Sequence, residues 1–552
     1  MNARSALRRP LWLCAVAAVL AGGCARGCKR EPAPAAAPQR LVIGIRDEPE
    51  LLDNVLGISK SSVLVNNCIY SRFVAWDDSL HLVPDLLTEI PAVDNGGISP
   101  DHLTYRYHLR RGVRWHDGVP LSSADVEFTY RVIMDSLCGA ETRQGFEDVD
   151  RCETPDSFTV VFHLRRPSAS FVSDTFSDED VLPKHLLESG MGKPFRALPF
   201  QRAPVGSGPF RFKEWVPASH LTVVRNPDYH GGAPALEEIE FRFVPDASAL
   251  ALQLQSRELD GVIGAEPGQI ALLRQVPGMR VFMTPALSFE QLVFNCDDPI
   301  LRDPALRRAL AAATDRQALA MHAYDNTATA AYSDAHPRMP WHVAAHDSLN
   351  AFDAERAKGL LQLAGWVDSD GDGVRDRRGK PLRLEICSTA GKEARERVQA
   401  MLQQQWRAVG VDLRVRNYAP PVLFGSAAEG GILATARYQV ALFGWQQPAD
   451  PAAMEQVYGS GFAPPNGQNF GRFRNARADS LFGVVGAQWA AAEREATYRE
   501  VEAVLARELP TIPLVWMMEI DAMPERLQGF RPNPTGSGHT WNVQAWRLGP
   551  PQ

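Results

Sequence analysis

The sequence is short of cysteine, of positive charge and of long apolar runs, and each shortage excludes a class of protein. Eight Cys in 552 residues are too few for a disulfide scaffold. Lys and Arg number 58 against 65 Asp and Glu, a net charge of -7 that argues against a nucleic-acid-binding surface. After the first thirty residues, no run approaches the roughly 18 apolar residues that span a membrane as a helix.

Motifs of common enzymes are missing as well. The chain has no HExxH helix, no GxSxG turn and no glycine-rich loop that would bind phosphate. It does have a 45% hydrophobic composition and enough length for about three domains of roughly 100–200 residues each. We therefore expect a globular protein with several domains and no enzymatic activity.

The first 23 residues have the pattern of an export signal. Three arginines precede an apolar stretch at residues 11–20, and small residues then lead to Cys24 in the string LAGGC. This string resembles the lipobox of bacterial lipoproteins, in which the cysteine becomes lipidated; the alternative is an ordinary signal peptide with an incidental cysteine. Cleavage before Cys24 removes three Arg and lowers the net charge from -7 to -10. Residues 24–39, rich in Pro and Ala, are then expected to tether the folded body to a membrane.

The rest of the chain alternates short strand patterns with amphipathic helices, which predicts a mixed α/β fold. Residues 41–45 are almost continuously apolar, and alternating apolar residues predict strands at 105–109 and 158–164. Between those two strands, Ser122 begins a helix with a pattern close to a capping box, in which Asp125 stands where Glu or Gln is more common.

One unit of strand, helix and strand is especially clear. Alternating apolar residues at 382–386 and 411–415 flank a helix that ends at Gly410. The short exit loop makes this unit a βαβ crossover, which predicts that the two strands are parallel. Ligands of such sheets bind beyond the carboxyl ends of the strands. The candidate ligand-binding residues at those ends are Ser388 and Tyr418.

Five strings of the sequence, taken in order, point to one protein family. They are LRRGVRWHDGVPLSSADVEFTYRVI, VGSGPFRFKEW, RNPDYHGGAPALEEIEFRFVPDASALALQLQSRELD, LVFNCDDPILRDPALRRALAAATDRQAL and YQVALFGWQQPADP. They closely resemble the family 5 extracellular solute-binding proteins of ABC importers, a group that includes dipeptide, oligopeptide and nickel binders. The resemblance runs from about residue 41 to residue 548.

This resemblance implies an α/β protein of the two-lobed periplasmic-binding-protein type (type II, cluster C) with an extra α/β subdomain. Such a protein closes on its ligand about a hinge, and hinge strands are expected near residues 291–294 and 511–513. The implied boundaries are 1–23 for the signal peptide, 24–39 for the lipidated tether, 40–62, 204–287 and 510–552 for lobe I, 63–203 for the extra subdomain and 288–509 for lobe II.

The resemblance also implies residues of the cleft between the lobes. Peptide-binding relatives have a Gly-Trp pair and, three residues after the Trp, an Asp that holds the α-amino group of the ligand. Here the Trp is Trp445, but Pro448 takes the Asp position, and the next acid is Asp450. Asp450 is either a displaced amine anchor or an Asp that caps a turn before Pro. Trp445 and Gln446 are expected to line the cleft.

A second departure concerns the Trp that often stacks on the ligand in peptide binders. Pro420 takes that position here, although Tyr418 is close enough in sequence to supply a ring. Together, Pro448 and Pro420 favour a protein that does not hold a free peptide amino terminus in the usual way.

An acidic segment has the spacing of a calcium loop at first, but the pattern is incomplete. Gly379 stands at the twelfth position, where a bidentate Glu is expected, so a solvated turn is the alternative to a bound Ca²⁺. No other cofactor is expected. The candidate calcium ligands are Asp368, Asp370, Asp372 and Asp376.

The cysteines of the body divide into two groups. In an exported protein, the fourteen-residue spacing of Cys138 and Cys152 is compatible with a disulfide, which we expect to form. The cysteines in apolar surroundings, which are expected to be buried thiols, are Cys68, Cys296 and Cys387.

These expectations combine into one function. The chain is expected to capture a small solute, a peptide or peptide-like compound, and to deliver it to an ABC permease as a monomer held at a membrane by its lipid. Alternatives are a metal complex or another small solute in the same cleft, and a sensor that presents its ligand to a signalling partner. A cell-envelope hydrolase is a less favoured third class.

Overall fold

The computed structural model describes residues 39–57, 59–140, 143, 145–175, 177 and 179–550. The export signal, the LAGGC string and Cys24 lie outside the described residues. Within the described ranges, every helix is too short or too polar to cross a membrane.

One sheet of eleven strands runs through the described part of the chain. In spatial order its strands are β16 (Asp412–Val415), β15 (Arg383–Ser388), β17 (Val440–Gln446), β11 (Met279–Phe294), β18 (Thr511–Pro524), β10 (Gly261–Ile263), β1 (Arg40–Ile45), β9 (Glu238–Phe243), β8 (His220–Arg225) and β7 (Phe210–Val216), while β12 (Ala328–Ala330) pairs with β18. β15 is parallel to β16 and β17, and β1 is parallel to β9 and β10. Parallel pairs on both halves of the sheet place the chain among α/β folds.

The predicted βαβ unit is confirmed. β15 continues into α11 (Glu393–Arg407) and then into β16, which is parallel to β15. Gly410, which follows the helix, has a φ of 92°, a left-handed conformation that suits a residue without a Cβ. The buried face of α11 carries Val398, Leu402 and Trp406.

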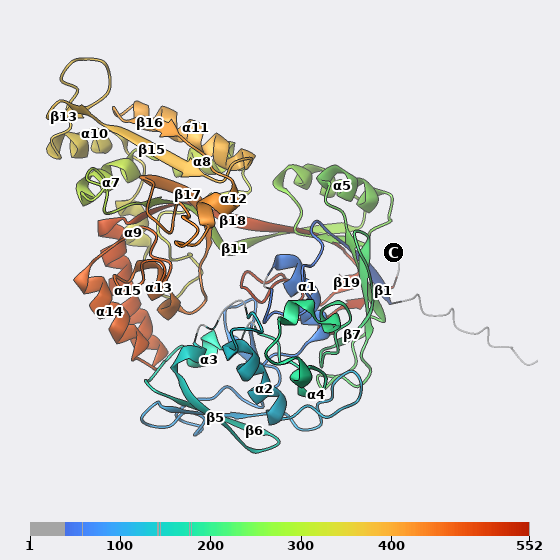
Figure 1. Ribbon diagram of the computed structural model, residues 1–552. Helices are drawn as coiled ribbons and strands as arrows, with labels where there is room; N and C mark the ends of the chain where they lie inside the picture. The colour runs from blue at the N-terminus through green and yellow to red at the C-terminus, as the bar shows by residue number, and fades with distance from the viewer. Residues whose placement is uncertain are drawn as a thin grey trace, which may run out of the picture. The chain divides into compact units, whose positions relative to one another are not determined.

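β11 and β18 are the two long strands that join the halves of the sheet (Figure 1). β11 pairs with β17 on one half, and β18 pairs with β10 on the other half. The two strands also pair with each other in antiparallel fashion, with irregular register between Pro285 and Phe289 and between Glu290 and Gln291. Regular pairing is therefore interrupted where the chain passes from one half of the sheet to the other.

The strands and the helix predicted near residue 122 form a small α/β subdomain. β4 (Thr104–His108), β6 (Thr159–Leu164) and β5 (Val149–Asp156) make a separate antiparallel sheet. Next to it lies α2 (Ser123–Met134), whose predicted capping box is present: the Ser122 N–H donates to the Asp125 carboxylate at 2.8 Å.

The other elements are short strand pairs and helices of varied length. The strands are β2 (Val74–Trp76), β3 (Leu82–Pro84), β13 (Asp376–Arg377), β14 (Lys380–Pro381), β19 (Leu527–Gln528) and β20 (Arg547–Leu548). The helices are α1 (Lys60–Ile69), α3 (Phe171–Asp174), α4 (Lys184–Leu187), α5 (Ala247–Gln255), α6 (Ile270–Leu273), α7 (Pro304–Ala312), α8 (Arg316–His322), α9 (Ala344–Leu349), α10 (Ala354–Leu363), α12 (Pro420–Phe424), α13 (Glu455–Tyr458), α14 (Ala476–Gly486) and α15 (Ala491–Glu508).

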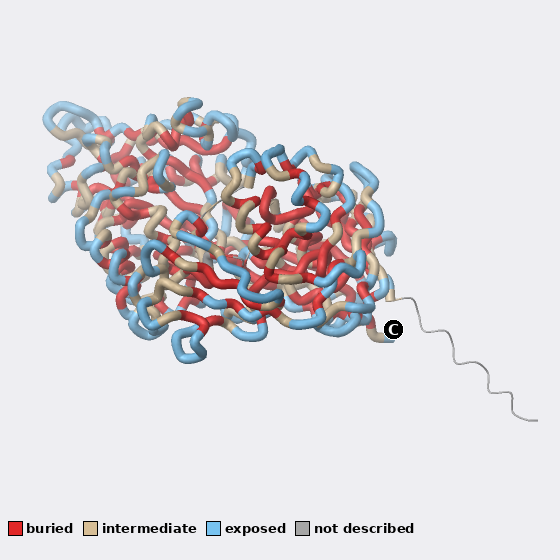
Figure 2. The backbone as a smooth tube through the Cα atoms, turned by 60° about the horizontal axis from the view of Figure 1, so that its bottom comes forward, coloured by how far each residue is buried: buried red, intermediate tan, exposed pale blue. Residues whose placement is uncertain are grey.

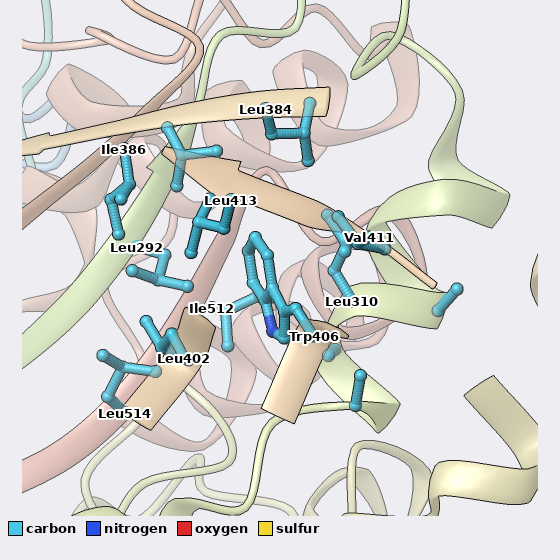
Figure 3. Packing of buried hydrophobic residues seen from close by; sticks show 14 of the residues in the cluster. Leu292, Leu310, Leu384, Ile386, Leu402, Trp406, Val411, Leu413, Ile512 and Leu514 are labelled. Atoms are coloured by element: carbon cyan, nitrogen blue, oxygen red, sulfur yellow. The ribbon is translucent and has the colours of Figure 1, made fainter. Parts of the chain in front are cut away.

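Separate groups of buried apolar side chains support the two halves of the sheet and the subdomain. In the tube view, buried backbone concentrates in the interior and exposed residues follow the outer turns (Figure 2). In the half that carries β15 and β16, the Trp406 ring lies among Leu402, Leu413 and Val411 (Figure 3). Its indole N–H donates to the Thr314 hydroxyl at 3.1 Å, which satisfies the one polar atom of the ring.

Candidate functional site: the carboxyl ends of β15 and β17

The carboxyl ends of β15 and β17 lie next to each other because these strands are parallel. Just beyond β16, Tyr418 forms a parallel bridge with Thr389, which follows β15. β11 lies on the other side of β17, with Glu290 opposite Gly444. The residues predicted to bind a ligand therefore belong to one edge of the sheet, which is where open α/β sheets bind their ligands.

Ser388 and Tyr418 differ in how much of each side chain is free. Ser388 is fully buried, and its hydroxyl donates to the Leu442 carbonyl at 2.8 Å, so it ties β15 to β17. Tyr418 is only half-buried and packs against the apolar cluster around Leu423. The Arg416 guanidinium lies 5.4 Å from the centre of its ring. Tyr418 thus keeps an accessible aromatic surface, whereas Ser388 does not keep a free hydroxyl.

Trp445 and Gln446 end β17 and face in different directions. The Trp445 ring is half-buried and packs near Phe443, with ring centres 6.4 Å apart. It lines a pocket together with Gln291 and Tyr458. The indole N–H of Trp445 and the Oε1 of Gln291 are buried and have no hydrogen-bond partner in the described part of the chain. Gln446 is exposed, so its side chain is available to a solute.

Asp450 is a buried capping residue with three partners. Its Oδ1 accepts from the Ala452 N–H at 2.9 Å and from Arg494, and its Oδ2 accepts from the Ser173 hydroxyl at 2.8 Å. It is the N-cap of the short 3-10 helix Pro451–Met454, which matches the capping alternative for an Asp before Pro. Both carboxylate oxygens are engaged within the protein, so the geometry does not favour Asp450 as an amine anchor.

One ion pair at these strand ends was not predicted from the sequence. Arg395, in the first turn of α11, donates from Nη2 to Glu290 at 2.8 Å and from Nε at 3.0 Å. Its Nη1 donates to the Thr389 hydroxyl at 3.0 Å. The side chains are 17% exposed for Arg395 and 11% exposed for Glu290. Burial raises the pKa of Glu290, although the Arg395 charge acts to lower it.

A signal for this pair was present in the sequence. Glu290 is the one charged residue in the strand string SFEQLVF, and a charge in a buried strand calls for a partner. Gly444 makes room for the pair, because a Cβ there would lie 3.2 Å from both Arg395 Nη2 and Glu290 Oε1. What the sequence could not supply was the identity of the partner, which lies 105 residues away.

The acidic loop gathers three of its four predicted residues. Carboxylate oxygens of Asp368, Asp370 and Asp372 lie within 4.8 Å of one another, and all three residues are exposed. Asp376 is engaged elsewhere, because it accepts from the Ser369 N–H at 3.0 Å and from the Ser369 hydroxyl. Asp368 itself accepts the N–H of Gly371 at 2.9 Å, a contact typical of a tight Asp/Gly turn.

The expected disulfide is not formed in the structure. Cys138 and Cys152 are both free thiols, Cys138 just after α2 and Cys152 on β5. Burial raises the pKa of each thiol, to about 12 for Cys152, so neither has the character of a reactive thiolate. Sequence spacing allowed a disulfide but did not specify how the helix end and the strand are placed. Cys68 and Cys387 are buried thiols as expected, whereas Cys296 is half-buried.

A buried cluster with a cation lies near the end of β18. The His539 side chain is 2% exposed, with Nε2 2.7 Å from the Glu519 carboxylate and Nδ1 2.7 Å from the Asp521 carboxylate. Lys60 Nζ lies 2.6 Å from the other Glu519 oxygen. Although burial acts to lower it, the two carboxylates raise the pKa of His539 to about 10. Despite burial, His539 and Lys60 hold the pKa of Glu519 well below its ordinary value.

A second buried acidic cluster lies at the start of β18. Asp334 and Glu502 are 4% and 1% exposed, and each acts on the pKa of the other. Asp334 also acts on the pKa of Tyr458, whose hydroxyl lies 3.2 Å from the hydroxyl of Thr511, the first residue of β18. Burial raises the pKa of both carboxyls. No Lys, Arg or His among the described residues forms an ion pair with Asp334 or Glu502.

Contacts outside the sheet join the helices after β17 to the small subdomain. Trp489, between α14 and α15, stacks on His102 with ring centres 3.6 Å apart and planes 14° apart. It also packs against the buried core of the subdomain. The Ala169 N–H donates to the Gly486 carbonyl at 3.3 Å nearby. With the Ser173–Asp450 hydrogen bond, these contacts hold the two parts together at a point away from β11 and β18.

Comparison with known proteins identifies the family. The model of the bacterial extracellular solute-binding proteins, family 5, matches residues 81–465, and the chain belongs to this family. It is therefore a solute-binding protein of the kind that serves ABC importers, and it acts outside the cytoplasm. Members of this family bind substrates and are not enzymes. The expected two-lobed α/β fold is confirmed by solved structures that match over almost the whole chain.

Two similar solved structures contain different ligands. The oligopeptide-binding protein AppA of Bacillus subtilis is 25% identical over 511 residues, which cover 92% of this chain and 91% of AppA. Its structure with a nonapeptide has a TM-score of 0.74 at 24% identity, covering 92% of this chain and 99% of that chain. NikZ of Campylobacter jejuni in complex with Ni(L-His) also has a TM-score of 0.74 at 24% identity, covering 93% and 100%.

Proposed function

We propose that the chain captures a peptide or peptide-like solute in the cleft between its lobes and delivers it, as a monomer, to an ABC permease. The observation that carries the proposal is the grouping of Trp445, Tyr418 and the Glu290–Arg395 pair at the carboxyl ends of parallel strands. This edge adjoins β11, one of the two strands that join the lobes, so closure about these strands would cover the solute. Peptide-binding relatives support a peptide as the solute class.

Closure of the two lobes around the solute is the step that makes this arrangement suitable for transport. Each lobe supplies part of the contacts, and water leaves the space around the solute when the lobes close. A solute favours the closed state only to the extent that it binds that state more tightly than the open one. The permease can then distinguish the loaded protein from the empty protein by shape.

Native mass spectrometry of the exported chain, purified and then incubated with a mixture of short peptides, tests the proposal. We expect a retained adduct with the mass of a peptide, which is released when the protein is denatured. If no peptide mass is retained from any mixture, peptide capture is wrong.

A metal complex is the second candidate solute, and it is favoured by the Ni(L-His) complex of NikZ. The same spectrum distinguishes the two, because an adduct with the mass of a metal and its organic ligand replaces the peptide adduct. A hydrolase would instead convert the retained peptide to products during incubation, and we expect the peptide mass to stay unchanged.

We also propose that Cys24 carries the lipid that holds the protein at a membrane. The LAGGC string supports this proposal. In cells given labelled fatty acid, the wild-type protein should take up label and sediment with membranes, whereas Cys24→Ser should do neither. If neither protein takes up label and both are found in the same fractions, an ordinary signal peptide is favoured.

A further inference from the structure

The guanidinium of Arg395 has hydrogen-bond donors to spare. A guanidinium carries five N–H donors, and Glu290 and Thr389 accept three of those of Arg395, at 2.8 to 3.0 Å. Two donors therefore remain, one on each terminal nitrogen. Both terminal nitrogens are held in place by existing bonds, so a further acceptor meets a group whose orientation is already fixed.

These donors lie beside an open part of the sheet edge. Gly444, opposite Glu290, is exposed, and it has no side chain that would cover the two charged groups beside it. Tyr324 adds a second observation, because its hydroxyl is buried and has no partner among the described residues. Burial raises the pKa of Tyr324, and the charges of Glu290 and Arg395 also act on it.

The two buried carboxylates near this edge have both oxygens engaged, whereas the exposed Glu393 and Glu396 each engage one. Glu290 accepts only from Arg395 and uses both oxygens, and Asp450 uses both of its own for a cap, an arginine and a serine. On the first turn of α11, Glu393 pairs with Arg397, and Glu396 accepts the Gly391 N–H. An ammonium group that approaches this edge therefore meets no free oxygen on Glu290 or Asp450.

The charge of Arg395 is already balanced. Its bidentate contact with Glu290 leaves the pair with no net charge, so a carboxylate that joined it would place two anions on one cation. A neutral carbonyl oxygen can accept the two spare donors without that repulsion. The amide carbonyls of a peptide are acceptors of this kind.

Building on the peptide-binding function above, we propose that Arg395 anchors the solute through a neutral amide carbonyl and that neither charged terminus of a peptide is recognised at this edge. The solutes that fit are peptides whose ends are blocked or absent, such as N-acylated, amidated or cyclic peptides, as well as the middle part of a longer peptide.

The test uses one random tetrapeptide mixture in four forms: with free ends, N-acetylated, C-amidated and blocked at both ends. Affinities are measured by native mass spectrometry and by competition calorimetry. The wild-type protein should bind all four forms with affinities within about threefold. Arg395→Met should weaken all four by about 10- to 100-fold, the range for losing hydrogen bonds to a charged donor.

Three variants separate recognition from folding. Arg397→Met, which removes the next arginine on α11, should leave all affinities within about threefold. The double variant Arg395→Met with Glu290→Gln avoids a buried unpaired acid and should bind as weakly as Arg395→Met. Glu290→Gln alone leaves Arg395 without its counter-charge, and it should shift preference about tenfold toward the forms with a free carboxylate. A merely structural role of Glu290 would weaken all forms equally.

The outcomes distinguish this inference from the function on which it rests. If the wild-type protein retains none of the four forms, peptide capture is wrong and the inference falls with it. If it binds the free-amine forms alone, or if both Arg395 variants bind like the wild type, peptide capture stands and the role of Arg395 is wrong.

Discussion

A group of carboxylates lies near each end of β18, and the two groups differ in whether a cation is present. Near its end, Glu519 and Asp521 enclose His539, with Lys60 outside them. At its start, Asp334 and Glu502 face each other and the hydroxyl of Tyr458, with no cation in contact in the described part of the chain. Glu519 and Asp521 lie on β18, and the first residue of β18, Thr511, contacts Tyr458 of the second group.

The difference shows how a cation decides the charge state of a buried acid. Burial alone favours the neutral form of a carboxyl. Where His539 and Lys60 supply positive charge, Glu519 stays ionised and its pKa falls. Where no cation is present, burial raises the pKa of Asp334 and of Glu502.

Removing the cation of the first group should have the largest effect. His539→Leu leaves the buried Asp521 without its cation and removes one of the two cations of the half-buried Glu519, so the free energy of unfolding at pH 7 should fall by about 3–5 kcal/mol. Urea unfolding followed by circular dichroism measures this change. The control is His81→Leu, since His81 is exposed and lies 3.9 Å from Asp77. Equal stability of the two variants would contradict the role given to His539.

Alkaline pH should weaken the same group without a mutation. The folded-state pKa of His539, about 10, lies above its ordinary value of 6.5, so its contribution is complete below about pH 6.5. It is lost as the pH rises toward 10, with a slope of about 1.4 kcal/mol per pH unit for one proton. Urea titrations at pH 6 to 10 measure the slope. In His539→Leu this part of the slope should be absent; an unchanged slope would assign it to other groups.

The second group should lose stability in a lower pH window. Because its pKa is raised on folding, Glu502 contributes fully below about pH 4.3, and this contribution is lost as the pH rises through the folded value. Glu502→Gln keeps the shape of the side chain but stays neutral at every pH. The stability of this variant should therefore match that of the wild type at pH 4 and exceed it by about 1 kcal/mol at pH 7. The free energy of unfolding of both proteins is measured at both pH values. Parallel pH curves would show that the pKa of Glu502 is not raised on folding.

The smallest effect should come from the outer cation. The Lys60 side chain is 79% exposed, so its ion pair with Glu519 is screened by water. Lys60→Met should therefore lower the free energy of unfolding by less than about 1 kcal/mol, and 1 M NaCl should remove the difference. A loss as large as that of His539→Leu would mean that the two cations act as one unit.

Features with a local cause could be predicted from the sequence. The capping box at Ser122, the parallel βαβ unit and the glycine at the end of α11 each follow from residues a few positions apart. The family strings then extended these pieces to a two-lobed fold, because they recur in the same order in proteins of known architecture. Short-range patterns and family order together were enough for the class of fold.

The site could be predicted only in part, because its partners are distant in sequence. Tyr418 was located by a strand end and Trp445 by the Gly-Trp pair of the family. The bonds that occupy Ser388 and Asp450, however, depend on residues up to 277 positions away. The Glu290–Arg395 pair spans 105 positions. A disulfide was compatible with the spacing of two cysteines, and only the structure, with Cys138 just after α2 and Cys152 on β5, showed that they remain free thiols. Chain topology, not local pattern, sets these contacts.

The stack of Trp489 on His102 bears on how scarce a solute the protein can collect. It consists of protein groups alone, so it favours the joined lobes whatever the solute is. The observed dissociation constant equals the dissociation constant of the binding-competent conformation divided by the fraction of molecules that already have this conformation. A tenfold rise in that fraction therefore gives tenfold tighter capture from dilute surroundings. The permease must then supply the same free energy to separate the lobes. The Trp489–His102 stack therefore favours binding of the solute and opposes its release.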